Sequence, residues 1–216
     1  MTPTRPSLVR PAVGSSGWSY PSWRPGFYPA GARADELLGL YAARLPAVEL
    51  NASGYRLPSA DQFASWAAQV PDGFRFAVKA PRLVLRQPGL VAERVRALGD
   101  RLGCVRVVVE SARDDGLLEA LTAAFSGMRL ALDLRHDSWA GCELGPGAVR
   151  TGDWGAGGDW RYLRFREPPY GEAALGAIAS RMRPLTAAGI DVLAFFRHED
   201  EPTAPLAALR LLELLG

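Results

Sequence analysis

Residues 60–79 read ADQFASWAAQVPDGFRFAVK and set the pattern for the whole chain. Their first half places apolar residues at helical spacing, a Pro-Asp-Gly turn follows, and residues 74–79 alternate large apolar side chains with Arg, Ala and Lys. Segments of helix length and strand length alternate in this way from about residue 8 to the end of the chain. The alternation predicts a parallel sheet with helical crossovers, and its repetition without a clear edge strand predicts a barrel.

The expected elements can be stated by residue range. Strands are expected at residues 8–16, 47–51, 74–79, 105–109, 130–135, 161–166 and 191–196, and helices at 34–44, 60–69, 90–102, 114–125, 172–188 and 203–215. Residues 139–160 are rich in Gly and Asp and offer only 148–151 as a further short strand. The predicted fold is therefore α/β, a TIM-type (β/α) barrel shortened around its fifth and sixth units.

The same alternation of segments predicts one domain and leaves one alternative fold. Residues 1–11 are expected to form a flexible tail, and residues 12–216 a single domain. A doubly wound open sheet is the alternative. It would need a glycine fingerprint after the first strand, but residues 14–17, Gly-Ser-Ser-Gly, lack that spacing.

The composition is that of a globular protein with one unusual bias. The chain is 48% hydrophobic and 22% charged, and its 25 basic and 23 acidic residues give a net charge of +2. Of the basic residues, 24 are Arg and one is Lys79, and Asn51 is the only Asn. The near-neutral charge argues against a protein whose main ligand is a polyanion, although nucleic acid stays as an alternative.

The sequence lacks the motifs typical of secretion, membrane insertion and the common cofactors. Cys104 and Cys142 lie far apart, and no signal peptide or membrane span is evident, so we expect a cytoplasmic protein with reduced thiols. His136 and His198 show no metal-binding spacing. Neither a Walker A sequence nor a G-x-S-x-G elbow occurs. We therefore expect no metal, no cofactor and no membrane partner.

Polar residues on four expected strands share one face. They are Glu49 and Asn51, Arg75 and Lys79, Asp133 and Arg135, and Tyr162, Arg164 and Arg166. Because side chains alternate along a strand, this face is opposite the apolar stripe and looks into the barrel, with most of these residues near the carboxyl ends of the strands. A barrel interior cannot hold lone charges, so Glu49 and Asp133 are expected to be matched by Lys79, Arg135 or Arg164.

This arrangement predicts a pocket for a small anionic or sugar-like ligand. The candidate catalytic residues are Glu49, Lys79 and Asp133. The candidate substrate-binding residues are Trp18, Tyr20, Asn51, Tyr55, Arg135, His136, Trp139 and Arg164. The alternative for the charged set is ion pairing that only holds strands in register, and the alternative for the tryptophans is packing at the barrel mouth.

Four motifs resemble those of the YecE-like family, domain of unknown function 72. They are residues 14–29, GSSGWSYPSWRPGFYP; residues 48–51, VELN, with 55–59, YRLPS; residues 74–79, FRFAVK; and residues 133–139, DLRHDSW. The resemblance implies a TIM barrel with a polar pocket at the strand carboxyl ends, but no agreed reaction. It weakens in the second half, where residues 164–167 read RFRE in place of the family's Arg-Phe-His-Gly.

Three functions stay open on the sequence. The first is an enzyme acting on a small anionic or sugar-like substrate, including a variant in which Lys79 forms a Schiff base. The second is a nucleic-acid binding or repair module. The third is a catalytically decayed paralogue that senses a ligand.

Overall fold

A computed structural model describes residues 11–51, 57–155 and 158–216. Of the tail expected over residues 1–11, only Pro11 falls within this part of the chain, and the rest of that prediction lies outside the described residues. No helix in the described ranges is long and apolar enough to cross a membrane.

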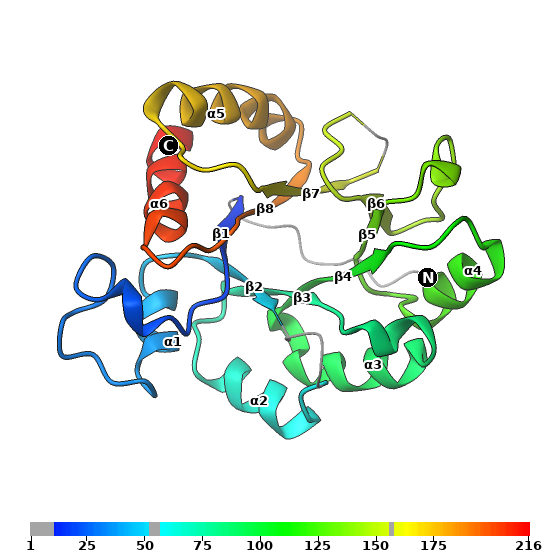
Figure 1. The fold of residues 1–216 in the computed structure, drawn as a ribbon, viewed down its shortest axis with the longest axis horizontal. Helices are drawn as coiled ribbons and strands as arrows, with labels where there is room; N and C mark the ends of the chain where they lie inside the picture. Colours follow the sequence, from blue (N-terminus) through cyan, green and yellow to red (C-terminus); the bar gives the residue numbers. More distant parts are fainter. Residues whose placement is uncertain (1–10, 52–56, 156–157) are drawn as a thin grey trace.

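Eight parallel strands form one sheet that curls into a nearly closed barrel (Figure 1). They are β1 (Ala12–Ser16), β2 (Ala47–Asn51), β3 (Arg75–Lys79), β4 (Leu102–Val109), β5 (Leu130–Leu134), β6 (Ala148–Arg150), β7 (Trp160–Phe165) and β8 (Asp191–Phe196). Their order in the sheet is β6-β5-β4-β3-β2-β1-β8-β7. A single bridge between Thr151 and Tyr162 joins the two ends of that order, and Gly152 N donates to Tyr162 O at 2.8 Å. The predicted TIM-type barrel is confirmed.

Helices cover most of the barrel but not its seam. They are α1 (Leu37–Ala42), α2 (Ala60–Ala68), α3 (Pro88–Val95), α4 (Asp115–Ala124), α5 (Glu172–Ala187) and α6 (Thr203–Leu215). After β5 there is only the short 3-10 turn η4 (Asp137–Trp139), and the described residues between β6 and β7 contain no helix. The shortening predicted around the fifth and sixth units is therefore present.

One expected helix is wrong in its extent. The pattern predicted a helix over residues 90–102, but α3 ends at Val95 and the 3-10 segment η3 (Arg96–Arg101) follows. Gly99 has a φ of 54°, outside the helical region, so no helix can run on to residue 102, and β4 begins at Leu102, earlier than expected. Two other helices begin directly after a capping residue. The Ser59 side chain accepts from Gln62 N at the start of α2, and the Asp114 side chain accepts from Leu117 N at the start of α4.

The alternation of side chains along the strands produces two apolar layers. Outward-facing residues such as Val48, Phe76 and Leu132 pack under the helices, and each such buried side chain contributes about 1.5–3 kcal/mol. A second cluster fills the barrel interior: Ala12, Ala47, Ala77, Cys104, Ala131, Val149, Trp160, Tyr162, Leu193 and Phe195. Small side chains on five strands leave room there for the large ones of β7 and β8. The lumen is therefore packed, and polar side chains gather at its two ends.

Candidate functional site

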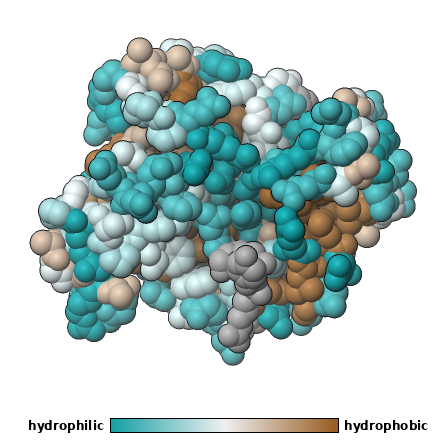
Figure 2. Space-filling model, viewed as in Figure 1, coloured by the Kyte–Doolittle hydropathy of each residue, from teal (hydrophilic) through white to brown (hydrophobic). Residues whose placement is uncertain are grey.

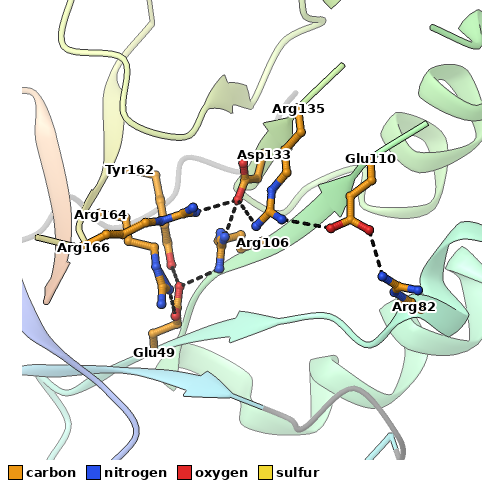
Figure 3. Close-up of polar contacts among 9 residues, drawn as sticks. All are labelled: Glu49, Arg82, Arg106, Glu110, Asp133, Arg135, Tyr162, Arg164 and Arg166. Atoms are coloured by element: carbon orange, nitrogen blue, oxygen red, sulfur yellow. Dashed lines mark hydrogen bonds and ion pairs between the residues drawn. The ribbon is translucent and has the colours of Figure 1, made fainter. Parts of the chain in front are cut away.

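Glu49, near the carboxyl end of β2, is fully buried. Its carboxylate accepts hydrogen bonds from the Tyr162 hydroxyl and from Arg164 Nη1, both on β7. Arg106 on β4 supplies a third donor, with 3.3 Å between Arg106 Nη1 and Glu49 Oε2. Three strands that are not neighbours in the sheet therefore meet at one carboxylate (Figure 3).

Arg106 links Glu49 to a second carboxylate, Asp133 on β5. Arg106 Nη2 donates to Asp133 Oδ2, and Arg166 Nη2 donates to the same oxygen at 2.8 Å. Arg135 Nη2 lies 3.5 Å from it. Burial would raise the pKa of Asp133, but Arg106, followed by Arg166 and Arg135, outweighs burial and holds that pKa below its ordinary value.

Arg135 carries the interactions outward to the surface. Its Nη1 donates to Glu110 Oε1 at 2.9 Å, and Arg82 Nη2 donates to Glu110 Oε2 at 2.8 Å. We call the connected set the mouth network: Glu49, Arg82, Arg106, Glu110, Asp133, Arg135, Tyr162, Arg164 and Arg166 (Figure 3). Its five guanidinium groups face three carboxylates, so it carries surplus positive charge. Hydrophilic side chains accordingly gather over the middle of the face seen in Figure 2.

Lys79 ends β3 beside the mouth network, in register with Asn51 on β2 and Arg106 on β4. Within the described ranges its amine makes no hydrogen bond or ion pair. Burial lowers the pKa of Lys79 below its ordinary value and Arg106 lowers it further, while Glu49 opposes the shift. Lys79 lines a pocket of about 290 Å³ together with Arg82, Glu110, Ser111 and Arg135.

A second pocket, of about 560 Å³, lies beside the loop that follows β1. Trp18, Tyr20 and Asn51 line it, with Trp66 of α2 on another side. The Trp18 and Trp66 rings meet edge to face, with centroids 5.5 Å apart. This pocket has the aromatic walls that suit a ring or a sugar.

Ser16 and His198 join the loops after β1 and β8 at the same end of the barrel. Ser16 Oγ lies 3.1 Å from His198 Nδ1 and accepts from His198 N at 3.0 Å. The Tyr20 ring stacks on the imidazole with centroids 4.8 Å apart. Burial lowers the pKa of His198, and Arg164 and Arg197 lower it further. Burial, with Glu49 next, raises the pKa of Tyr20 to about 12.

The structure brings most of the predicted charged residues together. Arg164 matches Glu49 and Arg135 approaches Asp133, as the strand pattern predicted. Lys79 matches neither carboxylate, which corrects the expectation for that residue. Arg106 takes the pairing role instead, because a guanidinium can donate from two nitrogens to two acceptors at once.

Three further residues in the loops after the strands were predicted to bind substrate, and neither of the two that the structure describes lines a pocket described above. Trp139 is buried in the outer core and its Nε1 donates to Ser111 O at 2.9 Å, so it packs under the mouth and lines neither pocket described above. His136 is exposed, with Nδ1 2.9 Å from Ser138 Oγ at the start of η4. Tyr55, also predicted to bind substrate, lies outside the described residues.

Sequence reasoning missed the residue at the centre of the network. Arg106 was overlooked as a site residue although it interrupts a run of valines, Val-Arg-Val-Val-Val, over residues 105–109. A lone arginine in an otherwise apolar strand is a usable signal, because a buried guanidinium needs carboxylates or carbonyls nearby. Tyr162 and Arg166 had been placed on the correct face but not assigned to the site.

The described residues of the site do not form a metal centre. Within residues 11–51, 57–155 and 158–216, no three His, Cys, Asp or Glu side chains gather closely enough to hold a metal ion. The carboxylates at the mouth are each bonded to arginine. The donor set here suits anions and hydrogen-bonding groups better than cations.

Comparison with known proteins places the chain in a family. No curated relative matches the sequence. Two crystal structures of DUF72 family proteins resemble it: one from Enterococcus faecalis, with a TM-score of 0.75, 14% identity and 95% of each chain covered; and one from Thermotoga maritima, with a TM-score of 0.73, 20% identity and coverage of 94% of this chain and 98% of that one. At these identities the likeness concerns the fold. The family model described as "protein of unknown function DUF72" matches residues 12–216, so the chain belongs to the DUF72, or YecE-like, family.

Proposed function

We propose that this protein binds a small anionic molecule, bearing a carboxylate or a phosphate, at the carboxyl end of the barrel, with Lys79 as the central contact. The observation that carries the proposal is the state of Lys79. Lys79 is half-buried and lines the pocket, and its amine has no hydrogen-bonding or ion-pairing partner among the described residues. A partly desolvated ammonium without a counter-ion is unfavourable, and an anionic ligand would relieve that cost.

The surrounding charges favour the same ligand class. The mouth network already has more guanidinium groups than carboxylates, so it does not offer Lys79 a free counter-ion. Arg82 and Arg135 line the pocket together with Lys79, and charge-assisted donors of this kind bind carboxylate and phosphate strongly.

The size and walls of the pocket suggest a small organic anion. Its volume of about 290 Å³ lies near the lower end of the range for small-molecule sites, roughly 300–1,000 Å³. Pro81, Val84 and Leu85 add apolar side chains to a lining that also holds Arg135 and Arg82. An anion with a short carbon body would contact both kinds of side chain. A sugar-like extension would reach the aromatic pocket, because Asn51, which lines that pocket, is paired with Lys79 in register.

Under this proposal Glu49 and Asp133 position the arginines. The Glu49 carboxylate is fully buried and is held by Tyr162, Arg164 and Arg106. Asp133 accepts from Arg106 and Arg166 through one oxygen. A carboxylate occupied in this way fixes its cations in space, so the ligand would meet a preorganised surface. Arg135 and Lys79, at the pocket wall, would make the direct contacts.

Ligand-dependent stabilisation tests the proposal. The melting temperature of the protein would be measured with phosphate, sugar phosphates, lactate, pyruvate and dicarboxylates, and calorimetry would follow for those that raise it. Lys79→Met is expected to raise the dissociation constant of such a ligand about tenfold or more, a loss of ~1.4 kcal/mol. Arg210→Ala is the control, because it too removes one positive charge, but on the exposed surface of α6, where Arg210 contacts Glu172 and Glu213.

Two outcomes would contradict the proposal. One is a panel in which no anion stabilises the protein at millimolar concentration. The other is binding that Lys79→Met and Arg210→Ala weaken equally. A short single-stranded DNA would be included as a competitor, and displacement of the small anion at nanomolar DNA would favour a nucleic-acid ligand instead.

A further inference from the structure

Lys79 has a property that simple anion binding does not require. It is the only lysine of the chain, in a protein where 24 other basic positions are arginine. Arginine binds anions with more hydrogen bonds than lysine, and here it supplies every other cation around the pocket. What lysine can do and arginine cannot is lose its proton and act as a nucleophile.

We propose that the Lys79 amine condenses with the carbonyl of a small 2-oxo acid and forms a Schiff base within the 290 Å³ pocket. This inference rests on the proposed function, since the carboxylate of the 2-oxo acid is the anion that the pocket would hold. It names the substrate class, a carbonyl adjacent to a carboxylate.

The geometry around Nζ supports a nucleophilic amine. No ion pair within the described ranges holds Lys79 in its charged form. Arg106, the partner of Lys79 across the β3–β4 ladder, is buried and committed to Glu49 and Asp133, so its positive charge is fixed beside the amine. A fixed cation and partial burial both favour the neutral form, in agreement with the lowered pKa of Lys79.

Arg135 gives the substrate its orientation. It lines the same pocket, and its guanidinium is partly exposed, with 42% of the side chain accessible. A carboxylate bound there would hold the adjacent carbonyl carbon toward Lys79. Arg135 is itself anchored by Glu110 at 2.9 Å, so it is fixed before the ligand arrives.

The chemical step balances without an oxidant or reductant. The Nζ lone pair attacks the carbonyl carbon and forms a C–N bond while the C=O π bond breaks, and the proton that the nitrogen then loses passes to the oxygen to give a neutral carbinolamine. Loss of the hydroxyl as water, with a proton supplied to it, breaks the C–O bond and leaves a protonated imine. Glu110 lines the pocket and is half-exposed, so it can exchange these protons with solvent.

Reductive trapping tests the inference on the full chain. The protein would be incubated with pyruvate and sodium cyanoborohydride and examined by intact mass and peptide mapping. One reduced adduct on the peptide that contains Lys79 is expected, in at least tenfold excess over the terminal amine. Because the chain has one lysine, the terminal α-amine is the competing primary amine, and the map separates the two positions. Lys79→Arg is expected to abolish the adduct, and its circular dichroism spectrum would verify folding.

A parallel measurement with lactate separates this inference from the proposed function. Lactate has the carboxylate but no carbonyl, so it can bind but cannot be trapped. Binding of both acids that depends on Lys79, with no adduct from pyruvate, would overturn the Schiff base and leave anion binding intact. No binding of either acid, and no adduct, would overturn both. An adduct confined to the terminal amine of the wild-type protein would also overturn the Schiff base.

Discussion

The two ends of the barrel use arginine in different ways. At the amino end, Arg129 pairs with Asp191, and Arg75 donates to the main-chain oxygens of Asp72 and Phe74. At the carboxyl end, the central arginine, Arg106, pairs with two side-chain carboxylates. The Arg129–Asp191 pair joins the residue before β5 to the first residue of β8, whereas Arg106 links two carboxylates that other arginines also contact.

The difference agrees with the proposed binding site at the carboxyl end. Guanidinium groups at the amino end tie loops to strand starts, which is a structural task. At the carboxyl end the same residue type is organised by Glu49 and Asp133 around a pocket that also holds Lys79. Barrel enzymes build their sites at this end, and the charge arrangement here agrees with that rule. Five measurements would break or sharpen the contrast.

Arg106→Met is expected to have the largest effect on stability. It leaves Glu49 and Asp133 without their shared cation, and removing one partner of a buried pair costs about 3–5 kcal/mol. The free energy of unfolding would be measured by urea denaturation. The exposed counterpart Arg210→Ala should leave the midpoint nearly unchanged. If Arg106→Met unfolds at the wild-type midpoint, the network does not support the fold.

Arg129→Met tests the amino end. It leaves the buried Asp191 without Arg129 and is expected to cost about 3 kcal/mol. Because the change lies at the opposite end of the barrel, the dissociation constant of any anion bound at Lys79 should stay the same. Weaker binding in this variant, measured by calorimetry under conditions where it is folded, would show that the two ends are coupled.

Lys79→Met should leave stability nearly unchanged. Since Lys79 has no hydrogen-bonding or ion-pairing partner among the described residues, methionine of similar length removes charge without breaking a pair. The ligand-free unfolding energy should stay within about 1 kcal/mol of the wild type. A loss of several kcal/mol would mean that Lys79 is a structural residue like Arg106.

Low pH should remove the contribution of Asp133 to the stability of the folded protein. Its pKa is lower in the folded protein than the value of about 3.9 in an unfolded chain, so its stabilisation is complete above pH ~4 and is lost as pH falls through the folded pKa. The free energies of unfolding of the wild type and Asp133→Asn, measured by denaturation between pH 7 and 3, are therefore expected to converge as the pH falls. A constant difference over this range would contradict the assignment.

His198 should affect stability in a higher pH window than Asp133. Its pKa is lowered on folding, so its neutral form stabilises the protein above the unfolded value of about 6.5, and this contribution is lost as pH falls through the folded pKa. His198→Asn should flatten the decline in stability below pH ~6.5. The exposed His136→Asn serves as the control, and equal slopes in both variants would rule out a special role for His198.

Much of the fold could be predicted because strand alternation is a strong signal. The phase that placed Glu49, Lys79, Asp133 and Arg164 inside the barrel follows from side-chain geometry alone. The shortened region was predicted because Gly and Asp replace a helical pattern there. The break at Gly99 was not predicted, since an isolated glycine in a helical pattern is often tolerated.

The central role of Arg106 and the unpaired state of Lys79 could not be predicted from the sequence. Both features depend on the register of neighbouring strands, and the register of the β3–β4 ladder shifts between Phe76 and Ala77. Only the folded chain sets Arg106 beside Lys79 and between two carboxylates. The role of Trp139 was equally undetermined, because an aromatic residue after a strand can either cap the core or face a ligand.

The seam between β6 and β7 has a consequence for how the chain could be rearranged. Consider a chain that began at β7, continued through β8 and β1, and ended at β6. Its strands would follow one another in the same order as they lie in the sheet. Pro11 and Gly216, the first and last described residues, line the same pocket, so a short linker would join them. A circular permutant opened at the seam would therefore keep every hydrogen-bonded strand ladder, with its new ends where no described helix stands.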